Sequence, residues 1–152
     1  MGVSGVGKTT IGEALARELR WPFIDADDFH PPRNVAKMTA GIPLEDADRL
    51  PWLDALNGKL REHRDAVLAC SALKESYRQR LTRGLTRFRF VYLHASFELI
   101  AARLAGRRHR YMPPALLRSQ FDTLEPPARA IAVDVAGEVH TSVAAIAAQL
   151  RA

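Results

Sequence analysis

The first residues of the chain match the pattern G-x-x-x-x-G-K-[ST] from Gly2 to Thr9. Glycines at these spacings let the backbone curl so that successive N–H groups point at one phosphate, and a helix that begins at Lys8 adds its positive end. The Lys8 ammonium would bridge two phosphates of ATP, and the Thr9 hydroxyl would bind Mg²⁺. A glycine-rich turn without a ligand does not explain the lysine. We therefore predict an ATP–Mg²⁺ site formed by Gly2, Ser4, Gly5, Val6, Gly7, Lys8, Thr9 and Thr10.

Aspartates follow the apolar run 21–24, where a strand would end. We assign Asp25 to the Mg²⁺ site, with Thr9, because phosphoryl transfer needs a metal held beside the phosphates. Asp27 lies two residues further on and points the same way as Asp25 if the strand continues. We predict that Asp27, with Lys8, is catalytic and accepts the proton of an acceptor hydroxyl. Asp28 is interpreted as a helix cap or a solvated loop residue.

The elements that must position these groups alternate along the chain. Apolar runs at 21–25, 66–71, 88–94 and 130–135 predict strands that are buried on both faces. Helical periodicity is found at 8–20, 49–64, 75–84, 96–106 and 138–151. This alternation predicts a three-layer α/β/α fold around a parallel sheet. Two segments do not fit it, 27–45 and 106–114, and we expect binding groups there because loops on a regular scaffold usually carry them.

A central apolar strand normally precedes a loop of this kind, but only Met1 precedes Gly2. Either the chain begins inside that strand, with Met1 as its last residue, or the sheet lacks its middle member. We favour truncation, because backbone groups on the two neighbouring strands would otherwise lose their partners.

Composition limits the remaining classes of protein. A chain of 152 residues fits one domain, 1–152, and it has no apolar run long enough for a membrane span. The net charge of +5 is spread along the chain without a dense basic tract, so we expect no nucleic-acid partner. Cys70 is the single cysteine and is interpreted as a buried apolar residue. We expect a cytoplasmic protein, since no secretory signal is present. A homodimer is compatible with the sequence, which does not specify the oligomeric state.

Four blocks of sequence resemble the bacterial thermoresistant gluconokinases. They are HPPRNVAKM at 30–38, GIPLEDADRLPWL at 41–53, CSALK at 70–74 followed by Tyr77 and Arg78, and SQFDTLEP at 119–126. The blocks fall in the order of the family and span most of the chain. The resemblance implies a P-loop kinase with a nucleoside-monophosphate-kinase-like fold that phosphorylates D-gluconate with ATP.

A sugar acid presents one carboxylate and a row of hydroxyls, so its site needs cations together with mixed donors and acceptors. The segment 27–53 is the predicted substrate loop. Arg49 is suited to a bidentate carboxylate contact, and Lys74 follows a strand at the edge where α/β sheets bind ligands. Trp52 is interpreted as core rather than as a sugar platform. The predicted substrate ligands are Asp27, His30, Asn34, Lys37, Arg49, Lys74 and Arg78.

Four arginines lie between Arg103 and Arg110, at the end of a predicted helix and the start of a loop. The segment looks like the lid entrance of nucleoside monophosphate kinases, which implies that Arg103 packs on the adenine and that Arg107 meets phosphate. We therefore add Arg103 and Arg107 to the ATP site, with Arg107 also catalytic, and place a lid at 106–114. Gluconokinases usually read His-Phe-Met where this chain has HRYM at 109–112, so an arginine intrudes there.

Two alternatives remain open at this point. A related small-molecule kinase, such as a shikimate kinase, would share the phosphate loop, the aspartates and the lid. A nucleotide-binding module without activity would result if loss of the first strand disabled the enzyme.

Overall fold

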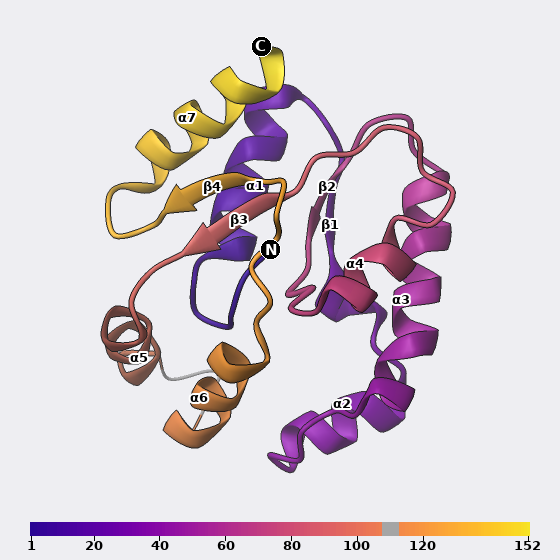
Figure 1. Cartoon of the computed structure of the whole chain (residues 1–152), viewed down its shortest axis with the longest axis vertical. Helices are drawn as coiled ribbons and strands as arrows, with labels where there is room; N and C mark the ends of the chain where they lie inside the picture. The colour runs from indigo at the N-terminus through magenta and orange to yellow at the C-terminus, as the bar shows by residue number, and fades with distance from the viewer. Residues whose placement is uncertain (108–112) are drawn as a thin grey trace.

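The computed structural model describes residues 1–107 and 113–152, so the centre of the predicted lid, 108–112, lies outside the described residues. Helices and strands alternate as the sequence predicts (Figure 1). The strands are β1 (Phe23–Asp25), β2 (Val67–Ala69), β3 (Val91–His94) and β4 (Ile131–Asp134). The helices are α1 (Lys8–Leu19), the short 3-10 helix η1 (Ala26–Phe29), α2 (Pro32–Thr39), α3 (Asp46–Arg61), α4 (Glu75–Leu81), α5 (Phe97–Ala105), α6 (Pro114–Thr123) and α7 (Val139–Arg151).

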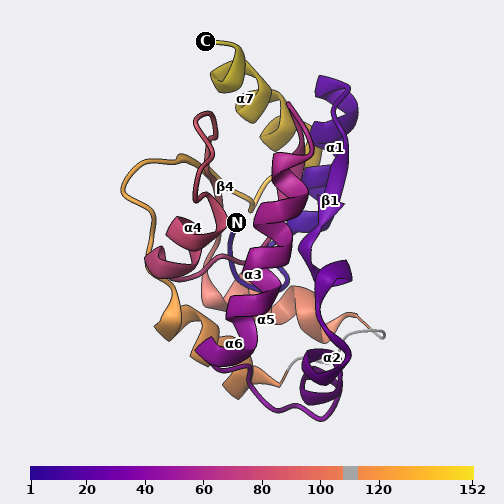
Figure 2. The same ribbon diagram turned by 90° about the vertical axis from the view of Figure 1, so that its right-hand side faces the viewer.

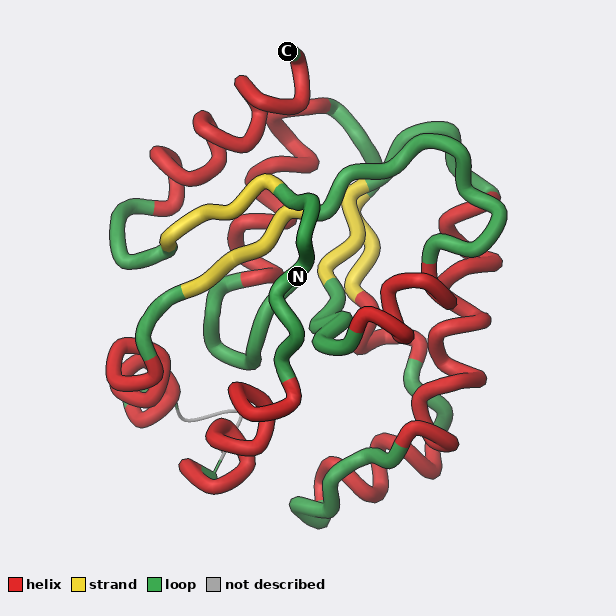
Figure 3. The backbone as a smooth tube through the Cα atoms, viewed as in Figure 1, coloured by secondary structure: helices red, strands yellow, loops and turns green. Residues whose placement is uncertain are grey.

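All strand pairs of the described chain are parallel, but they form two separate sheets. In one sheet β1 pairs with β2, and in the other β3 pairs with β4. The N-terminus lies between the two strand pairs (Figure 3). There Met1 donates its terminal N–H to the carbonyl of Val91 at 2.6 Å and accepts the N–H of Leu93 at 2.9 Å. On the other side, Gly2 donates to the carbonyl of Ser71 at 3.2 Å. Met1 and Gly2 therefore bridge the two sheets.

Helices cover the strands in two layers. The core on one side contains apolar side chains of α1, α5, α7, β3 and β4, such as Ile11, Ile100 and Ile146. A second core lies under α3 and α4 and includes Leu53 and Leu56. Helices α2, α5 and α6 gather at one end of the molecule in both perpendicular views (Figures 1 and 2). The predicted three-layer α/β/α class is confirmed.

Most helix predictions hold within a few residues, but η1, α2 and α6 were not among the predicted helices. Helix α3 begins at Asp46 rather than at residue 49, because Glu45 and Asp48 form a capping box around its first turn. Helix α2 begins with a proline at a position where no N–H is needed. Helix α6 was not predicted, although Pro114 could have signalled its start and Leu117, Phe121 and Leu124 have helical spacing.

Strand β1 ends at Asp25, as the apolar run 21–25 predicts, so the condition under which Asp25 and Asp27 would point the same way along a strand is not met. The strand ends there, because the Asp25 carboxylate accepts the N–H of Asp27 at 3.0 Å and caps η1. Asp25 and Asp27 are thus linked by a turn rather than aligned along a strand. Within the described ranges, no helix is long and apolar enough to cross a membrane.

Candidate active site

The phosphate loop has the backbone that its glycines predict. Gly5 and Gly7 have φ angles of 81° and 100°, in the left-handed region that disfavours other residues. A Cβ atom at Gly5 would lie 2.8 Å from the Leu104 side chain of α5, so space also requires glycine there. Helix α1 begins at Lys8, directly after the loop, and its N-terminal end is the place where phosphate binds in such loops. The Lys8 ammonium donates to the carbonyls of Gly2 and Val3 at 3.1 and 2.9 Å.

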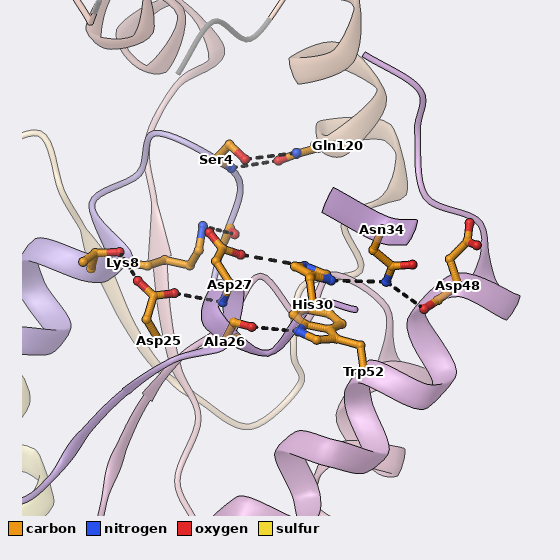
Figure 4. A network of polar contacts seen from close by, with 12 residues as sticks. Ser4, Lys8, Asp25, Ala26, Asp27, His30, Asn34, Asp48, Trp52 and Gln120 are labelled. Atoms are coloured by element: carbon orange, nitrogen blue, oxygen red, sulfur yellow. Dashed lines mark hydrogen bonds and ion pairs between the residues drawn. The ribbon is translucent and has the colours of Figure 1, made fainter. Parts of the chain in front are cut away.

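The predicted Mg²⁺ ligands lie together. The Thr9 hydroxyl donates to the Asp25 carboxylate at 3.1 Å, from the first turn of α1 to the end of β1 (Figure 4). Hydroxyl and carboxylate oxygens are the ligands that Mg²⁺ prefers when it also binds substrate phosphates. The donor set of Thr9 and Asp25 therefore fits the ion, and the glycine-lined loop beside it fits the phosphates.

A row of polar side chains leads from Asp27 into the substrate loop (Figure 4). His30 Nε2 lies 3.9 Å from the Asp27 carboxylate, and His30 Nδ1 lies 3.3 Å from Asn34 Nδ2. The ring of His30 stacks on Trp52 with centroids 4.2 Å apart, and the Trp52 indole donates to the Ala26 carbonyl at 2.7 Å. Trp52 is buried, as its interpretation as core requires. These contacts fix the imidazole between Asp27 and Asn34.

Electrostatics favour a neutral His30. Burial lowers the pKa of His30 below its usual value, the Asp27 carboxylate partly opposes this, and the charge of Arg49 adds to the lowering. The neutral ring accepts from Asn34 at Nδ1 and so carries its proton at Nε2, on the side of Asp27.

Two buried polar atoms of the substrate loop have no hydrogen-bond partner among the described residues. They are Asn34 Oδ1 and Arg49 Nε. Asn34 is fully buried, and its amide is oriented by donation to the Asp48 carbonyl at 3.0 Å. An unsatisfied buried group costs about 1–3 kcal/mol, so a ligand that supplies its partner gains that amount. One free acceptor and one free donor suit a ligand with both hydroxyl and carboxylate groups.

The two predicted lysines are each paired with an acid at the start of α3. Lys37 lies 2.7 Å from the Asp48 carboxylate, and Lys74 lies 3.2 Å from that of Asp46. Hydrogen bonding to Lys37 is the main cause that lowers the pKa of Asp48. Tyr77 donates a short hydrogen bond to Asp46, which is the main cause that lowers the pKa of that carboxyl, followed by Lys74. The cations are therefore held in place by anionic partners.

Arg78 does not join this group. It is 1% exposed and donates to the backbone carbonyls of Ala72 and Leu73 at 3.0 and 3.1 Å, and to the Glu75 carboxylate at 2.8 Å. Ala72 has a φ of 44°, which is unusual for a residue with a side chain. The structure thus gives Arg78 the role of holding a strained loop, and its prediction as a substrate ligand finds no support.

Cys70 directly follows β2. It is 4% exposed, which agrees with its interpretation as a buried apolar residue. Burial raises the pKa of its thiol to about 11, while the Lys8 ammonium lowers it and the Asp27 carboxylate raises it.

Comparisons with known proteins agree with this geometry. A family model described as shikimate kinase matches residues 4–150. The gluconokinase of Gluconobacter oxydans (strain 621H) is 47% identical over 148 residues, which cover 94% of this chain and 83% of that protein. The thermoresistant gluconokinase of Escherichia coli (strain K12) is 41% identical over 131 residues, 84% of this chain and 75% of that protein. A crystal structure of a gluconokinase from Sinorhizobium meliloti 1021 has a TM-score of 0.91 at 45% identity, covering 99% of this chain and 89% of that one.

The chain belongs to the gluconokinases of the shikimate kinase family. The resemblance of the blocks at 30–38 and 41–53 is confirmed, and so is the class of P-loop kinase. The similarity to the gluconokinases extends over nearly the whole described chain rather than over the phosphate loop alone.

Of the predicted lid, 106–114, the structure describes only residues 106–107 and 113–114. Arg103 donates to the Val135 carbonyl at 2.5 Å, so α5 is tied to the loop after β4. Arg107 is exposed and lies two residues after the end of α5. The predicted roles of Arg103 and Arg107 at ATP stay predictions.

Gln120 of α6 is a contact of the phosphate loop that residue-by-residue reasoning missed. Its carboxamide accepts the N–H of Ser4 at 2.7 Å and donates to the Ser4 hydroxyl at 3.1 Å (Figure 4). Helix α6 follows the lid, so Gln120 connects the segment after the lid with the phosphate loop. Only the family resemblance, whose block at 119–126 contains Gln120, pointed to it.

Proposed function

We propose that this chain is a gluconokinase, which transfers the γ-phosphoryl group of ATP to the 6-hydroxyl of D-gluconate and releases ADP. The observation that supports the substrate is the pair of buried, unsatisfied atoms in the substrate loop, Asn34 Oδ1 and Arg49 Nε. A hydroxyl of the substrate satisfies the first and its carboxylate the second. The gluconokinase relatives, at 41–47% identity, support the same choice.

The phosphate loop binds the triphosphate through backbone N–H groups and Lys8, with Thr10, Arg103 and Arg107 completing the site. Asp25 and Thr9 hold Mg²⁺, which when bound neutralises charge on the phosphates. Asp27 orients the acceptor hydroxyl and takes its proton while the new O–P bond forms and the bond to the ADP oxygen breaks. His30, Asn34, Lys37, Arg49 and Lys74 bind the sugar acid.

Neutral His30 supports the role of Asp27 by holding an N–H on its side of the ring. Because the transition state of phosphoryl transfer is loose, a base acts mostly by orienting the nucleophile and needs little perturbation of its pKa. Lys37 and Lys74 exchange part of their contact with Asp48 and Asp46 for the carboxylate or hydroxyls of gluconate. We also propose that the enzyme acts in the cytoplasm.

A coupled ADP-release assay over D-gluconate, shikimate and a nucleoside monophosphate tests the proposal. We expect turnover with gluconate that requires Mg²⁺ and is abolished in Lys8→Ala. Asp27→Asn lowers kcat by about 10²-fold or more, since it cannot accept the proton. The matched control Asp28→Asn, at an exposed neighbouring carboxylate, leaves kcat near that of the parent.

Two outcomes would overturn this function. Turnover with shikimate and none with gluconate would assign the chain to the other activity that the family model suggests. Calorimetric binding of ATP–Mg²⁺ without ADP release from any acceptor would indicate a nucleotide-binding module without activity.

A further inference from the structure

The backbone on both sides of Lys74 is held by one residue from a distant part of the chain. The carbonyl of Leu73, directly before Lys74, accepts the N–H of Glu125 at 2.9 Å. The N–H of Glu75, directly after Lys74, donates to the Glu125 carboxylate at 2.6 Å. These two groups belong to the two peptide units that flank Lys74. Glu125 therefore fixes the backbone from which the Lys74 side chain extends.

The bond to Glu75 also has a structural reason. Lys74 is the residue before α4, and within the described residues its side chain makes no capping hydrogen bond to that helix. The first N–H groups of a helix have no partner inside the helix, and a carboxylate is favoured beside them. Glu125 supplies such a carboxylate from outside α4. An experiment must therefore separate a capping role from a role at Lys74.

The ammonium of Lys74 is held by a second set of contacts. It lies 3.2 Å from the Asp46 carboxylate and 5.4 Å from the centre of the Tyr77 ring. The guanidinium of Arg49 lies 5.5 Å from the centre of the same ring. Because a lysine side chain is a flexible four-carbon stem, a fixed backbone limits the positions that its ammonium can reach. Glu125 and these contacts together keep Lys74 near Arg49.

Glu125 lies in the segment that follows α6, which also contacts the phosphate loop. Gln120 of α6 bonds to Ser4, and Leu124 after the helix packs against the apolar core. The chain then runs past α4 (Figure 2), where Glu125 makes its two bonds. One element thus contacts both the phosphate loop and the backbone beside Lys74. Phosphoryl transfer needs the acceptor to be aligned with the phosphate, and this connection sets that spacing.

We propose that Glu125 is a positioning residue, which holds the backbone of Lys74 so that the Lys74 ammonium meets the sugar acid. The proposal rests on the proposed function, in which Lys74 binds gluconate. Glu125 acts through Lys74, since its own carboxylate is occupied by the N–H of Glu75. Its loss weakens gluconate binding and leaves ATP binding unchanged.

A double-mutant cycle on gluconate binding tests this role. Calorimetry gives the Kd of D-gluconate, with a non-hydrolysable ATP analogue and Mg²⁺ present, for the parent, Glu125→Ala, Lys74→Ala and the double variant. We expect Glu125→Ala to raise Kd by about 3- to 10-fold and Lys74→Ala by about tenfold or more. The double variant should stay within about twofold of Lys74→Ala, because a residue that acts only through Lys74 has no effect once the ammonium is gone.

Three controls accompany the cycle. Glu125→Gln keeps an oxygen that accepts the Glu75 N–H, so its Kd should stay within about threefold of the parent. Asp122→Asn removes another exposed carboxylate, on α6 itself, and should leave Kd unchanged. The Kd of the ATP analogue should be the same in Glu125→Ala and the parent. Since Glu125 is exposed, we expect all these variants to fold.

Multiplied effects of the two substitutions in the double variant would refute the role at Lys74 and leave only a helix cap. An unchanged Kd in Glu125→Ala, or an equal weakening of the ATP analogue, would refute it as well. A parent chain that binds gluconate but releases no ADP contradicts the proposed kinase activity alone, because the cycle is measured without turnover. A parent chain that binds no gluconate contradicts both.

Discussion

Gln120→Ala tests whether α6 holds the phosphate loop in its working shape. The substitution removes both hydrogen bonds to Ser4, one to its N–H at 2.7 Å and one to its hydroxyl at 3.1 Å. Each such bond contributes a net 0.5–1.5 kcal/mol, so the pair contributes about 1–3 kcal/mol. If the loop needs this conformation in the transition state, kcat/KM for ATP falls by about 5- to 150-fold.

The assay is ADP release at saturating gluconate with ATP varied, beside Tm from thermal unfolding. Gln79→Ala is the matched control, because Gln79 is exposed on α4 and makes one long contact of 3.4 Å with Glu75. Gln120→Glu separates holding from charge: it still accepts the Ser4 N–H and can accept the Ser4 hydroxyl, but adds a negative charge beside the triphosphate loop. We expect Gln120→Glu to keep Tm and to raise KM for ATP more than it lowers kcat.

The reasoning is refuted if Gln120→Ala keeps kcat/KM for ATP within about twofold of the parent chain at unchanged Tm. The Ser4 contacts would then be a consequence of the fold and not a requirement of catalysis. A large loss in Gln79→Ala would equally count against it, since that residue lies away from the loop.

Three further predictions concern stability and substrate binding. The buried amine of Met1 binds its proton less readily in the folded than in the unfolded chain, so the free energy of unfolding rises as pH rises from about 5 to 8, by up to about 4 kcal/mol; urea titrations should show this rise reduced in Nα-acetylated protein, and equal rises in both forms would contradict it. Trp52→Phe keeps the stacking on His30 but leaves the Ala26 carbonyl without its donor, so urea unfolding should show a loss of about 1–3 kcal/mol; no loss would mean that water replaces the indole. Arg78→Lys should lower stability by a similar amount, because carbonyls of the loop after β2 lose donors, while KM for gluconate stays within about twofold; a large rise in KM with unchanged stability would restore Arg78 to the substrate site.

Local pattern was sufficient for the features that depend on neighbours in the chain. The periodicity of 8–20 and the loop before it predicted α1 and the glycine conformations, since both are decided within a few residues. The strand at 21–25 was predicted two residues too long at its N-terminal end, whereas its end at Asp25, where the Asp25 side chain caps η1, was predicted correctly. Helix α6 was hidden by its position after two prolines and an arginine-rich run, although its apolar spacing was present.

Features that depend on distant contacts left little signal in the sequence. Ser4 and Gln120 are 116 residues apart, and no spacing rule joins them. Arg78 was predicted to bind an anionic ligand, but it donates to backbone carbonyls of the loop after β2. Ala72 of that loop has a left-handed backbone conformation, which no sequence pattern predicted. Residue type predicted which hydrogen bonds these side chains could make, while the tertiary packing decided which partners they bind.

The pairing of the lysines has a consequence for selectivity that composition alone would not suggest. Lys37 and Lys74 contribute to a net charge of +5, yet each is held by an aspartate at the start of α3. A ligand must therefore offer hydrogen bonds to these lysines that compete with those of Asp48 and Asp46. The negative charge of a ligand alone adds little binding energy, because each lysine is already neutralised by its aspartate. A polyhydroxy acid can do so, since its hydroxyls also supply the partner that Asn34 Oδ1 lacks among the described residues. A diffuse polyanion supplies charge but not that hydroxyl, which favours a small substrate at this loop.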